Sequence, residues 1–114
     1  MIAALVTSLL AGCSSSEQYG AGVNKQVGSV AIKAILIDPG YNGRLVNIKG
    51  RVSTQCSSSG CWLFLDDGTG QVLVNMSPKG FSVPPRYGKE AVVTGLVRQS
   101  LEGVMLIADG VEIL

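Results

Sequence analysis

The chain has 114 residues, nine basic and eight acidic side chains, and a formal net charge of +1. Proteins that bind nucleic acid tightly carry a strongly basic surface, and this nearly balanced charge excludes that class. The chain contains no histidine, which excludes Ser-His-Asp and Cys-His nucleophiles and HExxH zinc chemistry. We therefore expect one small domain that is not an enzyme, and we predict no cofactor and no metal.

The chain opens with a short apolar run that ends in Leu10-Ala11-Gly12-Cys13. The run is far shorter than the roughly 20 residues that a transmembrane helix needs. It resembles the lipobox of bacterial lipoproteins, which implies a signal peptide over residues 1–12 and lipidation of Cys13. The alternative is a buried N-terminal helix with an unmodified thiol. Ser14 follows this cysteine. It resembles the sorting preference of Gram-negative outer-membrane lipoproteins, which avoid Asp at this position.

The lipobox resemblance implies a protein anchored by lipid in the cell envelope, facing the periplasm, with the membrane as its first partner. Residues 13–27 are small, polar and rich in glycine, and they predict a flexible tether. The domain is then expected over residues 28–114. It begins with an apolar segment, Val30 to Ile37, that suits a short helix or a strand and ends at the turn Asp38-Pro39-Gly40; we interpret it as a helix.

From Arg44 onward the pattern changes to β-branched runs separated by glycine turns. We predict five strands, at Arg44 to Gln55, Trp62 to Asp66, Gln71 to Met76, Ala91 to Arg98 and Val104 to Ala108. The long third connection, Ser77 to Lys89, contains three of the four prolines and predicts an irregular loop. This order of strands resembles the OB fold, so the predicted class is all-β, a five-stranded OB-fold-like Greek-key barrel with a short N-terminal helical segment.

A second resemblance rests on Cys56-Ser57-Ser58-Ser59-Gly60-Cys61-Trp62. This motif is similar to the Cys-x-x-x-Gly-Cys-Trp motif of small exported bacterial OB-fold proteins whose function is uncharacterised. The resemblance covers about Arg44 to Arg98. It implies the fold and supplies no activity.

Antiparallel pairing around this loop predicts which side chains share a face. We expect Val52 opposite Leu65 and Thr54 opposite Leu63 on the core face, which continues to Val72, Val74 and Met76 on the third strand. The candidate ligand-binding residues are those of the opposite face: Arg51, Ser53, Gln55, Trp62, Phe64, Leu73 and Asn75. OB folds bind ligands on this surface. The alternative is that the N-terminal segment, with Val30, Ile32, Ile35 and Leu36, covers the two aromatic rings.

The cysteines allow more than one chemistry. If lipid consumes Cys13, then Cys56 and Cys61 form an even pair, and an oxidising compartment favours a structural disulfide between them. The alternative is a thiol-based site, either redox-active or holding Cu(I), because Cys56, Cys61 and Met76 fall in one row across three strands and soft sulfur ligands suit that ion.

The sequence thus predicts an envelope lipoprotein that acts as a binding or interaction module through the outer face of the first three strands. The expected ligand is an envelope protein or a glycan, and we expect a monomer. Weak binding of single-stranded nucleic acid, a property of many OB folds, is a further alternative that the charge balance disfavours.

Overall fold

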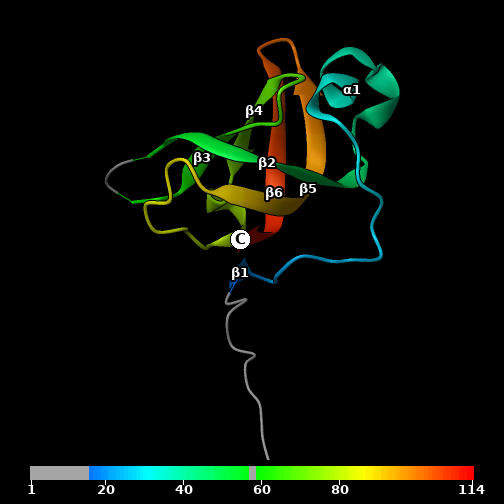
Figure 1. The fold of residues 1–114 in the computed structure, drawn as a ribbon. Coiled ribbons are helices and arrows are strands. Elements are labelled where there is room, and N and C mark those ends of the chain that lie inside the picture. The colour runs from blue at the N-terminus through cyan, green and yellow to red at the C-terminus, as the bar shows by residue number, and fades with distance from the viewer. Residues whose placement is uncertain (1–15, 57–58) are drawn as a thin grey trace, which may run out of the picture.

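A computed structural model describes residues 16–56 and 59–114 (Figure 1). The predicted signal peptide and Cys13 lie outside the described residues. The strands are β1 (Glu17–Gly20), β2 (Leu45–Gln55), β3 (Trp62–Asp66), β4 (Gln71–Asn75), β5 (Glu90–Ser100) and β6 (Gly103–Ile113). The helical elements are α1 (Ile32–Ile37) and two 3-10 turns, η2 (Pro39–Tyr41) and η3 (Ser77–Lys79). No helix among the described residues has the length and apolar character to cross a membrane.

Strands β2 to β6 close a five-stranded barrel. The sheet runs in the order β1-β6-β4-β3-β2-β5, and a further pairing of β6 with β5 completes the circle. Every neighbour pair is antiparallel except β4 with β6. This is the strand order of an OB fold, so the predicted all-β class, barrel and short helical segment are confirmed.

The core follows from the alternation of apolar residues along these strands. Leu63 and Leu65 of β3 are fully buried, and so are Val74 of β4 and Leu106 of β6. The intervening residues of the same strands are at least partly exposed. Each strand therefore contributes one face to the interior and leaves the other available for contacts.

Strand β2 is long because it pairs with two neighbours. Its first part, Leu45 to Arg51, pairs with β5, and its second part, from Arg51 onward, pairs with β3. Gly50 lies where the strand changes partners, and a Cβ there would approach the carbonyl oxygen of Asp66 to 2.8 Å. Any side chain at residue 50 would therefore push β3 away from β2.

Part of the segment predicted as a flexible tether belongs to the sheet. Strand β1 pairs with the last four residues of β6, from Glu17 opposite Ile113 to Gly20 opposite Gly110. Strand β6 continues to Ile113, well past the predicted end at Ala108, and this extension provides the edge to which β1 adds. Arg86 of the long loop then donates to both carboxylate oxygens of Glu17, at 2.7 and 3.0 Å.

This ion pair has a clear electrostatic signature. The hydrogen bond from Arg86, and then the one from the Tyr19 hydroxyl, hold the pKa of Glu17 below its usual value. The same carboxylate raises the pKa of Arg86. Residues 17–20 are thus fixed by both backbone and side-chain contacts.

The following residues, 21–30, run across the outside of β2 as a strap. The amide of Asn47 donates to the carbonyl oxygens of Asn24 and Val27, at 2.8 and 3.1 Å. The hydroxyl of Thr94 donates to the Asn47 side chain and accepts from the backbone N–H of Asn24. Ser29 adds a short parallel bridge to Asn47. Asn47 and Thr94 are buried, so the strap satisfies polar groups that would otherwise be costly to bury.

Helix α1 covers the end of the barrel beside the β3–β4 turn. Its apolar side chains Ile32 and Ile35 are fully buried in the core. No residue of its own caps its first turn. Instead Asp67 accepts from the backbone N–H of Ile32 at 2.9 Å, and Thr69 accepts from that of Lys33 at 3.1 Å. The turn between two strands therefore caps the helix.

The long connection between β4 and β5 is irregular after η3, as the prolines predicted. Its backbone is held by Gln55 at the end of β2. The Gln55 amide donates to the carbonyl oxygens of Val83 and Pro84, at 2.8 and 2.9 Å, and its oxygen accepts from the N–H of Arg86. One side chain thus fixes the loop to the barrel.

Candidate functional site

The outer face of β3 and β4 has a groove of about 320 Å³, lined by Trp62, Phe64, Leu73 and Asn75. Trp62 and Phe64 are two residues apart on β3, so their side chains lie on the same side of the sheet. Their ring centroids are 6.0 Å apart with the ring planes tilted by 60°. The register places Asn75 opposite Trp62 and Leu73 opposite Phe64. Four of the seven predicted ligand-binding residues therefore line one groove.

The apolar surface continues onto β6. Parallel pairing sets Leu73 beside Met105 and Asn75 beside Ile107, and both β6 side chains are half-exposed while Leu106 between them is buried. Met105 and Ile107 were not among the predicted ligand-binding residues, because no register was predicted for the last strand. Their alternation with Leu106 and Ala108 was the available signal.

We call this continuous patch the docking surface. It consists of Trp62, Phe64, Leu73, Asn75, Met105 and Ile107, on strands β3, β4 and β6. The half-exposed aromatic rings of this surface lie outside the buried core cluster and outside the set of residues that packs against it.

Helix α1 does not cover the docking surface. Ile32 and Ile35, which had been considered as a cover for the aromatic rings, are part of the core. Leu36 lies near Gly70 at the β3–β4 turn, and Val30 packs against the core. The described part of the N-terminal segment thus uses these apolar side chains to close the barrel end, and they leave the groove between Trp62 and Leu73 open.

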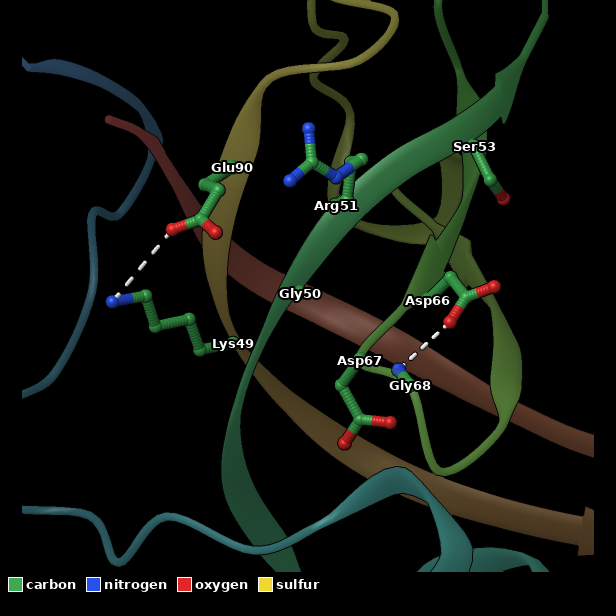
Figure 2. A pocket seen from close by; sticks show the side chains of 8 residues that line it. All are labelled: Lys49, Gly50, Arg51, Ser53, Asp66, Asp67, Gly68 and Glu90. Atoms are coloured by element: carbon green, nitrogen blue, oxygen red, sulfur yellow. Dashed lines mark hydrogen bonds and ion pairs between the residues drawn. The ribbon is translucent and has the colours of Figure 1, made fainter.

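A second, polar hollow adjoins this surface along β2 and β3. It has a volume of about 550 Å³, and its lining residues, drawn in Figure 2, are Lys49, Gly50, Arg51, Ser53, Asp66, Asp67, Gly68 and Glu90. We call it the charged hollow. Arg51 lies directly opposite Asp66 in the register, and Asp66 follows Phe64 by two residues on the same side of β3. The charged hollow therefore lies on the same side of β3 as the docking surface, next to Phe64.

Two carboxylates of the charged hollow have different surroundings. Burial opposes ionisation of Asp67, but hydrogen bonds from Ile32, Thr69 and Gly70 outweigh it, so the pKa of Asp67 is lower than usual. Asp66 is exposed and accepts only from the N–H of Gly68, at 2.8 Å. Asp67 is therefore a structural cap, whereas Asp66 keeps an oxygen for a ligand.

The predicted register between β2 and β3 was correct at one end and wrong at the other. Arg51 pairs with Asp66 and Val52 with Leu65, as expected, but Thr54 then pairs with Phe64 and Gln55 with Leu63. An irregularity between Val52 and Thr54 shifts the pairing by one residue. This is a β-bulge, which inserts an extra residue and turns the following side chains to the other face.

The bulge decides the positions of three predicted site residues. Arg51 and Ser53 line the charged hollow. Gln55 is directed to the loop carbonyls of Val83 and Pro84 and does not belong to the ligand face. The exposed side chain opposite Phe64 is Thr54, which the sequence analysis had assigned to the core face.

The two cysteines are close together at the end of the β2–β3 hairpin. The Sγ atoms of Cys56 and Cys61 are 4.0 Å apart, and the Ser59 hydroxyl is 3.4 Å from the first and 3.1 Å from the second. A separation of 4.0 Å is a sulfur hydrogen-bond distance, whereas a disulfide bond is about 2.05 Å long. The structure thus brings the predicted pair together as thiols.

The third sulfur of the alternative site is Met76. Its N–H donates to the carbonyl oxygen of Cys61 at 2.9 Å, so the two residues are neighbours across the strands as predicted. The Met76 side chain is fully buried in the core. Among residues 16–56 and 59–114, no group of three or more His, Cys, Asp and Glu side chains is arranged to hold a metal ion.

Comparison with known proteins supports the fold. The sequence matches no protein-family model and no curated protein. In structure, the chain is similar to a protein described as an aspartyl-tRNA synthetase from Leishmania major Friedlin, with a TM-score of 0.61 and 16% identity over 82% of this chain. The chain spans 22% of the length of that protein.

A second similar structure is that of the hypothetical protein YgiW from E. coli. The TM-score is 0.58 with 15% identity, and the match covers 77% of this chain and 96% of YgiW. YgiW is an OB-fold protein. At these identities the likeness shows a shared barrel.

Proposed function

We propose that this protein is a non-catalytic binding module of the cell envelope that holds a partner protein on its docking surface. The observation that supports the proposal most directly is the open groove between Trp62, Phe64 and Leu73, which the register extends to Met105 and Ile107. A patch of contiguous apolar side chains on the outside of a small domain marks an interaction site.

The residue types favour a protein over the other ligand classes. Protein interfaces are enriched in aromatic residues, methionine and arginine, with an apolar centre and a polar rim. Here the centre holds Trp62, Phe64 and Met105. Arg98, exposed on β5 opposite Met105, and Arg51, on β2, lie on its two sides. A glycan site would need more hydrogen-bonding side chains than Asn75 and Thr54 supply.

The charges beside the docking surface disfavour a polyanion. The charged hollow has two basic side chains and three carboxylates along its lining. Nucleic-acid sites on OB folds combine aromatic rings with a basic groove that follows the phosphates. We therefore expect that the protein does not bind a single-stranded oligonucleotide at physiological salt.

The test compares Trp62→Ala with Tyr87→Ala. A photo-reactive residue at position 75 identifies the protein that contacts the groove in cells, and the purified pair is then titrated. Loss of a buried tryptophan anchor weakens such complexes by about 30-fold. Tyr87 is an exposed aromatic of the long loop, with 78% of its surface accessible, so its removal is the matched control.

Equal affinities of Trp62→Ala and the unchanged protein would contradict the proposal. So would the same crosslinked products from positions 75 and 87, because a specific surface gives its own product. Binding of chitotriose instead of a protein, again lost in Trp62→Ala, would keep the surface and replace the ligand class.

The membrane anchor and the disulfide are proposals of the same account. The lipobox supports acylation of Cys13, and the 4.0 Å separation of the Cys56 and Cys61 sulfurs supports their oxidation in the envelope. In that step the two thiols lose two protons and two electrons to a thiol oxidase, and one S–S bond forms. The bond would link the two ends of the β2–β3 loop and stabilise the folded domain by about 2 kcal/mol.

Mass spectrometry of the protein extracted from membranes tests both proposals together. We expect the mass of residues 13–114 plus acyl groups on Cys13, less two hydrogens for the disulfide. Acyl label that persists in Cys13→Ala would contradict the anchor. Two intact thiols with a retained copper ion would instead support the alternative site of Cys56, Cys61 and Met76. The hydrogen bond between Met76 and Cys61 and the 4.0 Å separation of the two cysteine sulfurs favour that site.

A further inference from the structure

The charged hollow has a feature that the docking of an apolar partner does not explain. Arg51 and Asp66 are directly opposite each other on β2 and β3, where oppositely charged residues ordinarily attract each other. The ion pairs among the described residues are Lys49–Glu90, Lys79–Asp109 and Arg86–Glu17. Arg51 and Asp66 join none of them.

Each of these two side chains makes a different contact. The guanidinium of Arg51 donates from Nη1 to the carbonyl oxygen of Gly88 at 3.1 Å, which leaves most of its donors available. The carboxylate of Asp66 accepts from the N–H of Gly68 with one oxygen. Figure 2 shows the two side chains on adjacent strands, with Arg51 directed to the side of Glu90 and Asp66 directed away from it, and with no interaction between them.

The remaining charged side chains of the hollow are also of mixed sign. Lys49 and Glu90 form a loose pair of 3.8 Å with both side chains at least half exposed, and such pairs exchange easily with water or ligand. Asp67 is committed to the cap of α1. Among the described charges of the hollow, the guanidinium of Arg51 and the carboxylate of Asp66 are thus the two that are neither in an ion pair nor needed for the cap, and both line the hollow.

We propose that the charged hollow binds the zwitterionic head of an α-amino acid, with its carboxylate on Arg51 and its ammonium on Asp66. A guanidinium binds a carboxylate through two parallel hydrogen bonds, and a carboxylate accepts well from an ammonium. The side chain of the ligand would extend along β3 towards Phe64, two residues from Asp66 on the same side of the strand. A ligand with a single charge would leave one of the two groups unsatisfied.

Two sources offer this chemistry, a free amino acid and a zwitterion at the end of a peptide branch. L-leucine is the probe for the first, and Nε-acetyl-L-lysine, whose longer arm carries the same head, is the probe for the second. The controls are N-acetyl-leucine, which lacks the ammonium, and leucinamide, which lacks the carboxylate. Backbone chemical shifts of the ¹⁵N-labelled protein at Gly68 and Gly88 report the titrations.

We expect L-leucine or Nε-acetyl-lysine to shift both amides in a saturable way, and each singly charged analogue to bind about tenfold more weakly or worse. The tighter of the two probes identifies the source. Arg51→Gln is expected to abolish the preference for leucine over leucinamide. Asp66→Asn is expected to abolish the preference for leucine over N-acetyl-leucine. Lys25→Gln, on the strap, is the control and keeps both.

Equal shifts from the zwitterion and its two analogues, or no saturable shift from either probe, would overturn the inference. The proposed partner site is judged separately, because its readout is the effect of Trp62→Ala on the protein complex. A charged hollow that fails with leucine therefore leaves the docking surface intact, and the reverse holds as well.

Discussion

Asp67 connects two parts of the molecule that are 35 residues apart in sequence. One carboxylate oxygen accepts from the first helical N–H at Ile32, and the other accepts from Thr69 and Gly70 in its own turn. A six-residue helix has little stability of its own. Helix α1 therefore depends on this carboxylate and on the burial of Ile32 and Ile35.

Asp67→Ala should lower the free energy of unfolding by about 0.5–2 kcal/mol, the usual cost of a lost cap. Because the folded pKa of Asp67 is lowered, its contribution is present above the unfolded value of about 3.9. It is lost as the pH falls through the folded pKa. Urea denaturation at pH 7 and at pH 2.5 measures both effects.

The control is Asp66→Ala, which removes a carboxylate with a single turn hydrogen bond. A difference between Asp67→Ala and the unchanged protein that is equally large at both pH values would contradict the role of the ionised carboxylate.

At single residues, the sequence predicted side chains well where strands pair regularly. Trp62, Phe64, Leu73 and Asn75 share a face because β3 and β4 follow strict alternation through a tight turn. Gln55 could not be placed in the same way. The bulge near Ser53 reverses its direction, and no local residue preference announces a bulge at a serine.

Among the elements, the strap is the one whose position rests on buried polar contacts. Asn47 belongs to β2, yet its side chain holds the backbone of residues 24 and 27 from outside the barrel. Asn47 alternates with the apolar residues Val46 and Ile48 along the sequence, and nothing in the sequence indicates what would cover it. The strap and its partner are separated by about 20 residues, so only the fold reveals the contact.

Asn47→Ala should release the strap and leave Thr94 without an acceptor. Burying such groups without partners costs about 1–3 kcal/mol. Hydrogen exchange is the sensitive measurement, with faster exchange expected at Asn24 and Val30, whose N–H groups are bonded to Thr94 and to the Asn47 carbonyl oxygen. Lys25→Ala is the control, because the Lys25 side chain is exposed and none of the hydrogen bonds that hold the strap involves it. Unchanged exchange at these two N–H groups in Asn47→Ala would contradict the role of Asn47 in holding the strap.

Five of the six strands were foreseen, and the reason for the miss is physical. The β-branched runs from Arg44 onward carry their own signal. Strand β1 consists of Glu-Gln-Tyr-Gly, which has little strand preference, and it forms because β6 extends past the end of β4 and offers a free edge. Its assignment to a tether followed from composition, and tertiary pairing overrode it.

At the scale of the whole molecule, the proposed attachment and the proposed binding surface belong to different parts of the barrel. Figure 1 places β1 and the C-terminus together at one end of the barrel, and α1 with the β5–β6 hairpin at the other. The chain enters the sheet at Glu17, so an anchor at Cys13 would attach to the β1 end. The docking surface lies along the side of the barrel, on β3, β4 and β6, where an anchored domain can meet a partner.

The central claim is that this side surface is open in the isolated protein and covered in the complex. Trp62 is the sole tryptophan of the chain, so its fluorescence reports the groove without labels. The most direct measurement is acrylamide quenching of the purified protein, before and after addition of the partner protein that photo-crosslinking identifies. We predict a red-shifted, readily quenched emission that becomes blue-shifted and protected on binding. Emission that is already blue and protected in the isolated protein, or that the partner leaves unchanged, would contradict the account.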